Sequence, residues 1–198
     1  MPSGTYVVAG RPEAFSCAPG PGGWRYASDV LDLVCDSRFR TARVQVTAAD
    51  ARVRGGRTVL EDGTPVLTWL ATSDPSTERH AVADAVEVAS PGALVALARR
   101  VSGPGEGPVT LDLAAVRFEP PRLAGLSVRL RVSRVGAERH DALLAECWHV
   151  DDLDAGTRTA LYLAGDVVLW AARDGHEPWE VELEALDGPP SALAAHLP

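Results

Sequence analysis

The stretch LDLVCDSRFRTARVQVT, which runs from Leu31 to Thr47, decides the fold class. Apolar and polar residues alternate on both sides of a turn at Asp36 and Ser37, and this period of two is that of a strand with one buried face. The residues that we expect on the buried face are Leu31, Leu33, Cys35, Ala42, Val44 and Val46. The stretch therefore predicts a β-hairpin.

The same alternation extends away from the hairpin in both directions, and turns rich in Gly, Pro and Asp separate its segments. Further strands are expected over residues 6–9, 51–54, 57–61, 66–71, 81–88, 109–118, 126–133, 143–150, 158–163, 167–172 and 179–186. The polar residues 72–79 predict a loop. A chain with this many short alternating segments favours a mainly β protein built of antiparallel sheets.

One segment breaks the pattern, the sequence SPGALVALARRV from Ser90 to Val101. Ser90 is a good N-cap, and Pro91 suits the first helical position, where no backbone N–H is needed. The apolar stripe of this helix is expected to consist of Leu94, Leu97, Ala98 and Val101. Arg99 and Arg100 at its C-terminal end complement the helix macrodipole. We therefore expect one main helix in this half of the chain.

Composition excludes several classes of function. The chain has 198 residues and a net charge of −8, and its basic residues are spread through the expected strands. We therefore expect no nucleic-acid partner. No apolar run approaches the roughly 20 residues of a membrane-spanning helix, and no secretory leader is recognisable, so we expect no membrane span and a cytoplasmic protein. The chain has no Lys, which excludes Schiff-base chemistry.

The cysteines are few and widely spaced. Cys17, Cys35 and Cys147 form no CxxC pair, and an odd, scattered set of this kind is typical of reduced thiols in a cytosolic protein.

The two halves of the chain show similar features when the sequence is shifted by 101 positions. The residues brought into register are Arg57, Thr58, Leu60, Val66 and Trp69 with Arg158, Thr159, Leu161, Val167 and Trp170, Pro19 with Pro120, and Ser90 with Ser191. The order of strands and turns agrees too, and Ser191 would cap a second helical turn. We therefore expect an N-terminal β-repeat over residues 1–105 and a C-terminal β-repeat over residues 106–198, closed on each other as one compact unit. Chance agreement in an Ala- and Arg-rich chain is the alternative.

Three segments resemble, in order, the glycolipid-binding family found in bacteria. They are LVCDSRFRTARVQV, ASPGALVALARRV with EPPRL behind it, and TRTALYLAGDVVLW. The matching residues are Cys35, Asp36, Phe39, Arg40, Thr41 and Arg43, with Ser90, Pro91, Leu97, Arg99 and Arg100 in the central motif. The central motif departs from the family, because the expected Thr-Pro, Thr-Asn and Leu-Pro pairs are missing before the paired arginines. The resemblance implies a duplicated spiral β-roll and says more about the fold than about any ligand.

Aromatic residues are the first candidates for a binding site. Trp69, Trp148 and Trp170 lie in apolar strands, and Tyr162 is close to the last of them. One interpretation is that they fill the core, since aromatic residues supply large buried area in β proteins. The other is that two curved sheets enclose a cavity for an apolar ligand, across which Trp69 and Trp170 face each other. On the second interpretation all four are ligand-binding residues.

The densest group of titratable residues lies in HDALLAECWHVDD, residues 140–152. In a strand Cys147, His149 and Asp151 share one face, and Glu146 and Trp148 share the other. A zinc site usually needs a fourth ligand and often a tight Cys pair, neither of which is visible, so we expect no metal. His149 is a candidate acid or base because its pKa lies nearest neutrality. Glu146 is the other candidate, since burial would raise the pKa of its carboxyl group.

Polar residues at the central hairpin form the last candidate site. Asp36 and Arg40 are able to orient a polar headgroup of a ligand, because Arg binds carboxylate and phosphate in a bidentate manner. Ordinary ion pairs at a solvated hairpin end are the alternative. Motifs for nucleotide binding, serine hydrolysis and zinc proteolysis are missing, so we expect no cofactor.

These patterns together predict a mainly β protein, with duplicated antiparallel sheets forming a β-roll or barrel-like structure. We expect it to bind a hydrophobic lipid-like or polyketide-like small molecule in an interior cavity. The alternative is a cofactor-independent cyclase or isomerase of a natural-product intermediate, in which Trp residues shape the substrate and His149 or Glu146 serves as acid or base. A third interpretation is a structural or interaction module with a filled core. The ligand, the oligomeric state and the inward face of each strand stay open.

Overall fold

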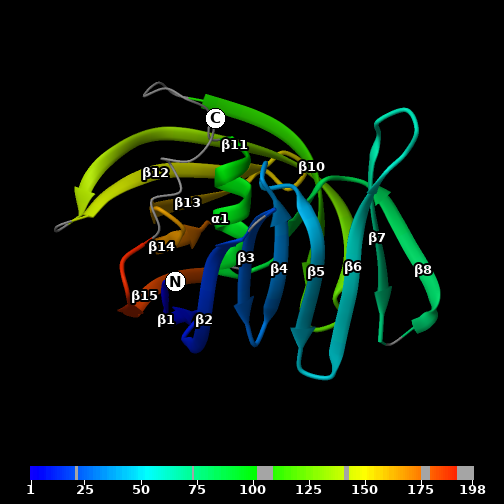
Figure 1. Ribbon diagram of the computed structural model, residues 1–198, viewed down its shortest axis with the longest axis horizontal. Coiled ribbons are helices and arrows are strands. Elements are labelled where there is room, and N and C mark those ends of the chain that lie inside the picture. Colours follow the sequence, from blue (N-terminus) through cyan, green and yellow to red (C-terminus); the bar gives the residue numbers. More distant parts are fainter. Residues whose placement is uncertain (21, 73, 102–108, 141–142, 175–178, 191–198) are drawn as a thin grey trace.

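The computed structural model of the protein describes residues 1–20, 22–72, 74–101, 109–140, 143–174 and 179–190 (Figure 1). The strands of the first half are β1 (Ser3–Val8), β2 (Arg11–Gly20), β3 (Gly23–Ser28), β4 (Leu31–Asp36), β5 (Thr41–Ala48), β6 (Ala51–Val59), β7 (Pro65–Ala71) and β8 (Asp74–Val82). The remaining elements are β9 (Ala85–Glu87), helix α1 (Pro91–Arg100), β10 (Val109–Glu119), β11 (Ala124–His140), β12 (Leu143–Asp152), β13 (Thr157–Ala164), β14 (Val167–Arg173) and β15 (Trp179–Asp187). The protein is mainly β, as the alternation predicts.

The fifteen strands form one sheet in the order β8-β7-β6-β5-β4-β3-β2-β1-β15-β14-β13-β12-β11-β10-β9. Within each half, consecutive strands pair antiparallel as a meander, and the pairing of β1 with β15 joins the two halves. The short strand β9 pairs with β10 in parallel. The order begins at β8 and ends at β9, so the sheet is not closed into a barrel.

The sheet rolls around the helix. Figure 1 shows α1 standing between the strands of the first half and the strands β11 to β14. It contacts β4 and β9 from one side and β11, β12 and β14 from the other. The two ends of the sheet approach each other, since β10 contacts β8 and β9 contacts β5. The backbone N–H of Thr41 also donates to the carbonyl oxygen of Asp84, between β8 and β9, at 2.9 Å. The helix is therefore enclosed by strands of both halves.

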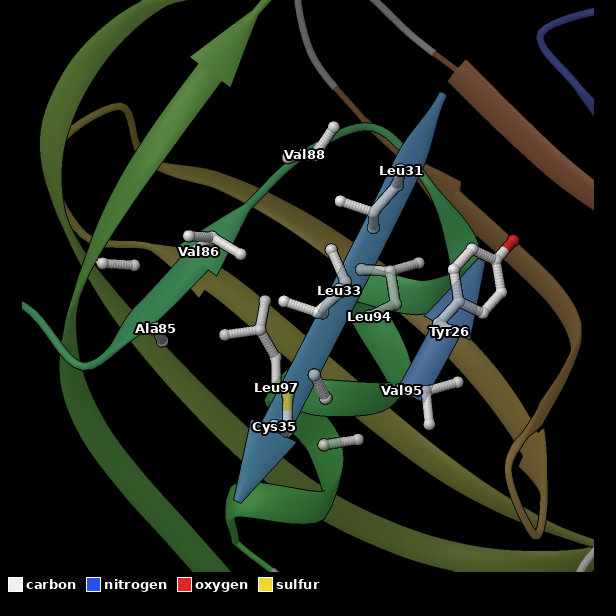
Figure 2. Packing of buried hydrophobic residues seen from close by; sticks show 14 of the residues in the cluster. Tyr26, Leu31, Leu33, Cys35, Ala85, Val86, Val88, Leu94, Val95 and Leu97 are labelled. Atoms are coloured by element: carbon white, nitrogen blue, oxygen red, sulfur yellow. The ribbon is translucent and has the colours of Figure 1, made fainter. Parts of the chain in front are cut away.

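The core consists of the inner face of the sheet and the whole circumference of α1. Nine of the ten helical residues are buried, from Pro91 to Arg99, so the expected single apolar stripe is only part of the buried surface. Leu94 and Leu97 pack in one cluster with Leu31 and Leu33 of β4 (Figure 2). Burying one such side chain contributes about 1.5–3 kcal/mol. The interior of the roll is occupied by this packing.

The central hairpin is confirmed, with one correction. Leu31 pairs with Val46 and Leu33 with Val44, and all four are buried. The pairing shifts between Val34 and Cys35, so that Cys35 opposes Thr41. Ala42 is the extra residue of this bulge, and it is exposed, while Thr41 takes the buried place. The expectation that Ala42 faces inward is wrong because a bulge moves the following side chains to the other face.

Two predicted boundaries are also wrong. The segment 72–79, expected as a loop, contributes most of β8, and the expected strand over 81–88 is divided between the end of β8 and β9. Strand β8 lies at the edge of the sheet, and its residues Glu78, Arg79 and His80 are exposed. An edge strand with polar residues on both faces has no hydrophobic alternation to mark it.

The repeat over residues 1–105 and 106–198 stays a prediction. The shift by 101 positions places the hairpin β6–β7 on the hairpin β13–β14, but it places both β3 and β4 on the single long strand β11. The expected helical turn at Ser191 lies outside the described residues. In the part of the chain that the structure describes, no helix has the length and apolar character needed to cross a membrane.

Candidate ligand-binding pocket

The outer face of strands β12 to β15 carries an apolar cluster that is separate from the core. Trp148 and Leu161 pair between β12 and β13, and both belong to the core. Because successive side chains of a strand alternate, the next pair, Cys147 and Tyr162, points outward. The outer cluster is formed by Ala145, Ala164 and Leu169, with Leu143, Tyr162 and Leu183 packed against them.

A bulge in β14 shapes this outer face. Tyr162 pairs with Trp170 and Leu163 with Val168, so that Leu169 is an extra residue in β14. Bulges bend a strand and redirect its side chains. Leu169 consequently packs into the outer cluster, and the ring of Trp170 lies beside that of Tyr162. The two ring centroids are 5.8 Å apart and the planes are tilted by 54°.

A hollow of about 520 Å³ opens over this cluster. Its lining consists of Glu138, Leu143, Tyr162, Leu169, Trp170, Glu182 and Leu183. Five of these side chains are apolar or aromatic, and two are carboxylates. Pockets for small molecules usually span roughly 300–1,000 Å³ and combine an apolar lining with a few polar groups. The hollow therefore has the size and the chemistry of a ligand site.

The hollow is acidic as well as aromatic. The indole Nε1 of Trp170 donates to Oε1 of Glu180 at 2.7 Å, which holds the ring in place. The carboxylate of Glu138 raises the pKa of the Tyr162 hydroxyl above its ordinary value, and burial adds to this shift. Burial, and after it the charge of Glu138, raises the pKa of the Cys147 thiol. Negative charge thus reaches the floor of the hollow.

The structure brings together two of the residues expected to bind a ligand, Tyr162 and Trp170. Sequence analysis missed Glu138, Leu143, Leu169, Glu182 and Leu183, which complete the lining. The alternation of the last strand does place Glu182 on the solvent side. Nothing in the sequence marks that side as concave, because the bulge at Leu169 is visible only in the strand pairing.

Trp69 lines a second groove, of about 570 Å³, between the β5–β6 turn, β7, β8 and the β10–β11 turn. Its ring meets Phe118 edge to face, with centroids 5.7 Å apart. A Cβ atom on Gly125 would lie 2.4 Å from the indole, so only glycine leaves room there. Trp69 therefore belongs to the core cluster, whereas Trp170 points away from it. The expectation that these two side chains face each other across one cavity is wrong.

Trp148 is a core residue. Its side chain is 1% exposed, and among the described residues its Nε1 has no hydrogen-bond partner. The filled-core interpretation accounts for the position of this tryptophan.

The two candidate acid–base residues lie on opposite faces of β12, as the alternation predicts. Glu146 faces the interior, where its carboxylate pairs with Arg99 of α1 and lies 3.7 Å from Nη1 of Arg134. His149 is half-buried on the outer face, where its neighbours across the strands are Ser133 and Ala160. Neither residue lines the hollow over Tyr162 and Trp170. The acid–base role of each stays a prediction.

Asp36 and Arg40 hold the turn of the central hairpin. Oδ1 of Asp36 accepts the backbone N–H groups of Arg38 and Arg40, at 2.9 and 3.0 Å. Oδ2 accepts from the guanidinium groups of Arg40, at 2.8 Å, and Arg57, at 3.0 Å. Partial burial opposes ionisation, but these bonds outweigh it and lower the pKa of Asp36. Because the carboxylate oxygens are already used, the geometry favours the structural interpretation over headgroup binding.

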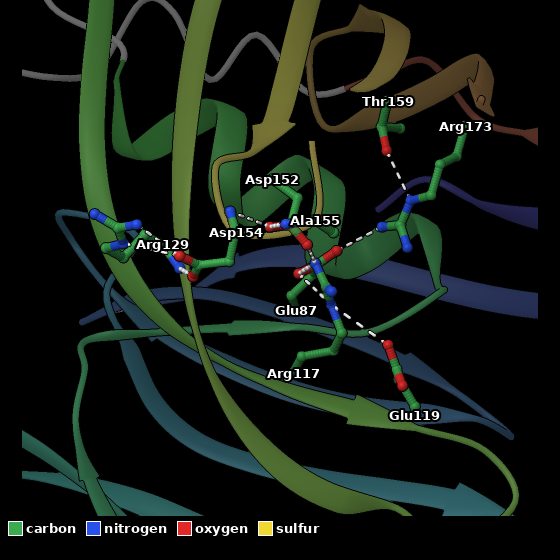
Figure 3. Close-up of polar contacts among 9 residues, drawn as sticks. All are labelled: Glu87, Arg117, Glu119, Arg129, Asp152, Asp154, Ala155, Thr159 and Arg173. Atoms are coloured by element: carbon green, nitrogen blue, oxygen red, sulfur yellow. Dashed lines mark hydrogen bonds and ion pairs between the residues drawn. The ribbon is translucent and has the colours of Figure 1, made fainter. Parts of the chain in front are cut away.

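A buried ionic network was not expected from the sequence (Figure 3). Glu87 of β9 is only 2% exposed, and it accepts from Arg117 of β10 at 2.8 Å and from Arg173 of β14. Arg117 also pairs with Asp152 of β12 at 2.5 Å. The network ties the short edge strand β9 to β10, and through Arg117 and Arg173 to β12 and β14. Within the described ranges, no three His, Cys, Asp or Glu side chains are grouped so as to hold a metal ion.

Comparisons with known proteins are sparse. No family model matches the sequence, and no curated protein matches it. Among solved structures, the chain is similar to the crystal structure of a DUF1089 family protein from Pseudomonas aeruginosa, with 16% sequence identity and a TM-score of 0.42. The match covers 85% of this chain and 89% of that chain.

Proposed function

We propose that the protein binds an apolar small molecule, of lipid-like or polyketide-like character, in the hollow over Tyr162 and Trp170. One observation carries the proposal. A concave and mostly apolar surface of ligand size lies on the outside of the sheet, where a strand normally turns polar residues to water.

The site proposed is on the outer face and not in the interior. Helix α1 fills the inside of the roll, and its buried residues pack with both halves of the sheet. The rings of Tyr162 and Trp170 are half-buried, so part of each ring stays in contact with water. A ligand that covers them would complete a burial that the fold leaves unfinished.

The expected affinity is moderate. Covering the exposed apolar surface of the hollow contributes about 2 kcal/mol, and the ligand buries its own apolar surface as well. The loss of translational and rotational freedom on association opposes these gains. We therefore expect dissociation constants in the micromolar range for a simple apolar ligand.

A neutral fluorescent probe tests the proposal. N-phenyl-1-naphthylamine gains fluorescence in apolar surroundings, and we expect the protein to bind it saturably. Trp170→Leu and Tyr162→Leu should each weaken binding, by about tenfold for the larger ring. Leu126→Ala is the matched control, since Leu126 is an exposed apolar residue of β11 outside the hollow.

Equal binding by all three variants and the unchanged protein would place the probe elsewhere and overturn the proposal. Circular dichroism and thermal melts of each variant establish that the fold is retained. Mass spectrometry of small molecules extracted from the purified protein provides an independent test, and the expected extract contains an apolar compound that is depleted from Trp170→Leu.

A further inference from the structure

Carboxylates on the surface of this sheet commonly have an Arg as cross-strand partner. Asp112 lies 2.7 Å from Nε of Arg131, and Asp151 lies 2.6 Å from Nε of Arg158. Such pairs neutralise local negative charge. Other exposed carboxylates, such as Glu184 of β15, have no ion-pair partner among the described residues, so an acidic side chain of this kind is informative only where it lines a hollow.

Two such side chains line the hollow. Glu138 comes from β11 and Glu182 from β15, and neither has an ion-pair partner among the described residues. The strands that carry Tyr162 and Trp170 lie between β11 and β15 in the sheet. The two carboxylates thus border the aromatic floor from opposite sides, and the lining contains no Arg or His.

The aromatic rings also present negative electrostatic potential to the hollow. The face of an aromatic ring is the negative part of its quadrupole, and Trp is the best partner for a cation. The indole N–H of Trp170 donates to Glu180, and this is a third carboxylate beside the ring. The raised pKa of Tyr162 reflects the charge of Glu138 at that hydroxyl. A cation above the rings would face the negative ring faces and the carboxylates of Glu138 and Glu182.

Other polar ends of a ligand fit less well. An anionic headgroup would be repelled by Glu138 and Glu182, and the chain as a whole carries a net charge of −8. A divalent metal prefers several oxygen ligands in close array, whereas the described residues contain no such group. An uncharged sugar can stack on Trp170 and donate hydroxyl hydrogen bonds to the carboxylates, but it leaves their negative charge uncompensated.

We propose that the ligand of this hollow carries an organic cation, a substituted ammonium group joined to an apolar chain, which lies over Tyr162 and Trp170 between Glu138 and Glu182. The ammonium group is held by its charge and by the rings, and the chain runs over Leu143, Leu169 and Leu183. The inference rests on the function proposed above, because the same hollow holds the apolar part.

Competition with the neutral probe tests the headgroup separately from the chain. Dodecyltrimethylammonium, dodecyl maltoside and dodecyl sulfate share one chain length and differ in the charge of the head, and each is used below the concentration at which micelles form. We expect the ammonium compound to displace N-phenyl-1-naphthylamine about tenfold more effectively than the maltoside, with the sulfate weakest. The preference should shrink as NaCl is raised from about 20 to about 500 mM.

Charge-neutral variants locate the effect. Glu138→Gln and Glu182→Gln should each weaken binding of the ammonium compound about threefold to tenfold and change binding of the maltoside less than twofold. Glu184→Gln is the control, because this exposed carboxylate also belongs to β15 but does not line the hollow. A loss of equal size in Glu184→Gln would mean that the cation responds only to the overall charge of the protein and would overturn the inference.

The outcomes separate the two proposals. Equal competition by all three heads, with probe binding still dependent on Trp170, would overturn the cation and leave the apolar pocket standing. Probe binding that does not depend on Trp170 or Tyr162 would overturn both. Preference for the maltoside would indicate a glycoside headgroup and would likewise refute the cation.

Discussion

Replacing Gly92 by Ala should destabilise the protein, although the same change in an exposed helix is stabilising. Gly92 is the second residue of α1 and lies against the ring of Tyr26. A Cβ atom at this position would stand 2.3 Å from Cγ and Cδ1 of the ring and 2.7 Å from Cε1, whereas ordinary contacts begin at 3.4 Å. Either the helix or the ring has to move by more than an ångström.

The ring is poorly placed to move. Tyr26 is 1% exposed, its ring is stacked parallel to that of Phe15 with centroids 6.0 Å apart, and Trp24 lies 6.1 Å away on the same strand. Its hydroxyl donates to Glu13 at 3.0 Å. Overpacking of this kind costs about 1–3 kcal/mol, and we expect the upper end. The better helix propensity of Ala offsets up to about 1 kcal/mol, so the net loss should be about 2 kcal/mol.

Urea unfolding followed by tryptophan fluorescence measures this loss as a lower midpoint at an unchanged slope. Gly136→Ala is the control, because no atom lies within 4 Å of the Cβ position there, and its midpoint should stay close to that of the unchanged protein. In a Tyr26→Leu background the space for the new methyl group exists, so Gly92→Ala should then cost little. A midpoint for Gly92→Ala equal to or above that of the unchanged protein would refute the reasoning.

Two further predictions concern buried carboxylates. Burial raises the pKa of Glu13 although its hydroxyl partners lower it, so the folded protein holds this proton more tightly than the unfolded chain, and stability should fall as the pH rises above the ordinary value of 4.5. Thermal melts of Glu13→Gln should show a flatter dependence in this window, and an unchanged slope would contradict the assignment. Glu87→Gln removes the charge that faces Arg117 and Arg173 in the interior and should lower the free energy of unfolding by about 3 kcal/mol. Asp112→Asn, which breaks an exposed pair with Arg131, should leave the urea midpoint unchanged, and losses of similar size in the two variants would show that the buried network has no special weight.

Most strands of the roll could be predicted because each has one face on the core. The alternation of Leu31, Leu33 and Cys35 is a direct record of that burial. The alternation is missing where neither face of a strand is buried, as in β8, whose edge position leaves polar residues on both faces. It also fails by one residue at bulges, because the extra residue at Ala42 has no signature in the order of amino acids.

The position of the helix could not be predicted from its own sequence. The segment 90–101 has an apolar stripe that suits a helix lying on one sheet face, and the macrodipole alone accounts for Arg99 at its C-terminal end. In the structure Arg99 is 5% exposed, pairs with Glu146 and donates to the carbonyl oxygen of Gly165. A buried guanidinium is tolerable only with such partners. These partners lie 47 and 66 positions away along the chain, so local sequence carries no information about them.

The candidate site was half predictable for the same reason. Tyr162 and Trp170 were selected by residue type, and their shared location follows from the hairpin β13–β14, which the Gly165–Asp166 turn indicates. Their face depends on the bulge at Leu169, which turns Leu169 and Trp170 outward together. With regular pairing between β13 and β14, one of these two side chains would face the core. The apolar hollow is therefore a consequence of one irregular residue.

The two faces of the sheet use their apolar side chains differently. A sheet that rolls around a helix uses its inner face for packing, so Trp148 and Leu161 are not accessible to a ligand. Apolar side chains on the outer face are buried only against one another, and any part of them that stays exposed costs solubility. Leu169 is only 9% exposed, but the rings of Tyr162 and Trp170 beside it stay half-buried, and the hollow over them is bordered by two carboxylates without an ion-pair partner among the described residues. An aromatic patch that folding leaves partly exposed and that combines these groups is better explained by what it binds than by what it stabilises.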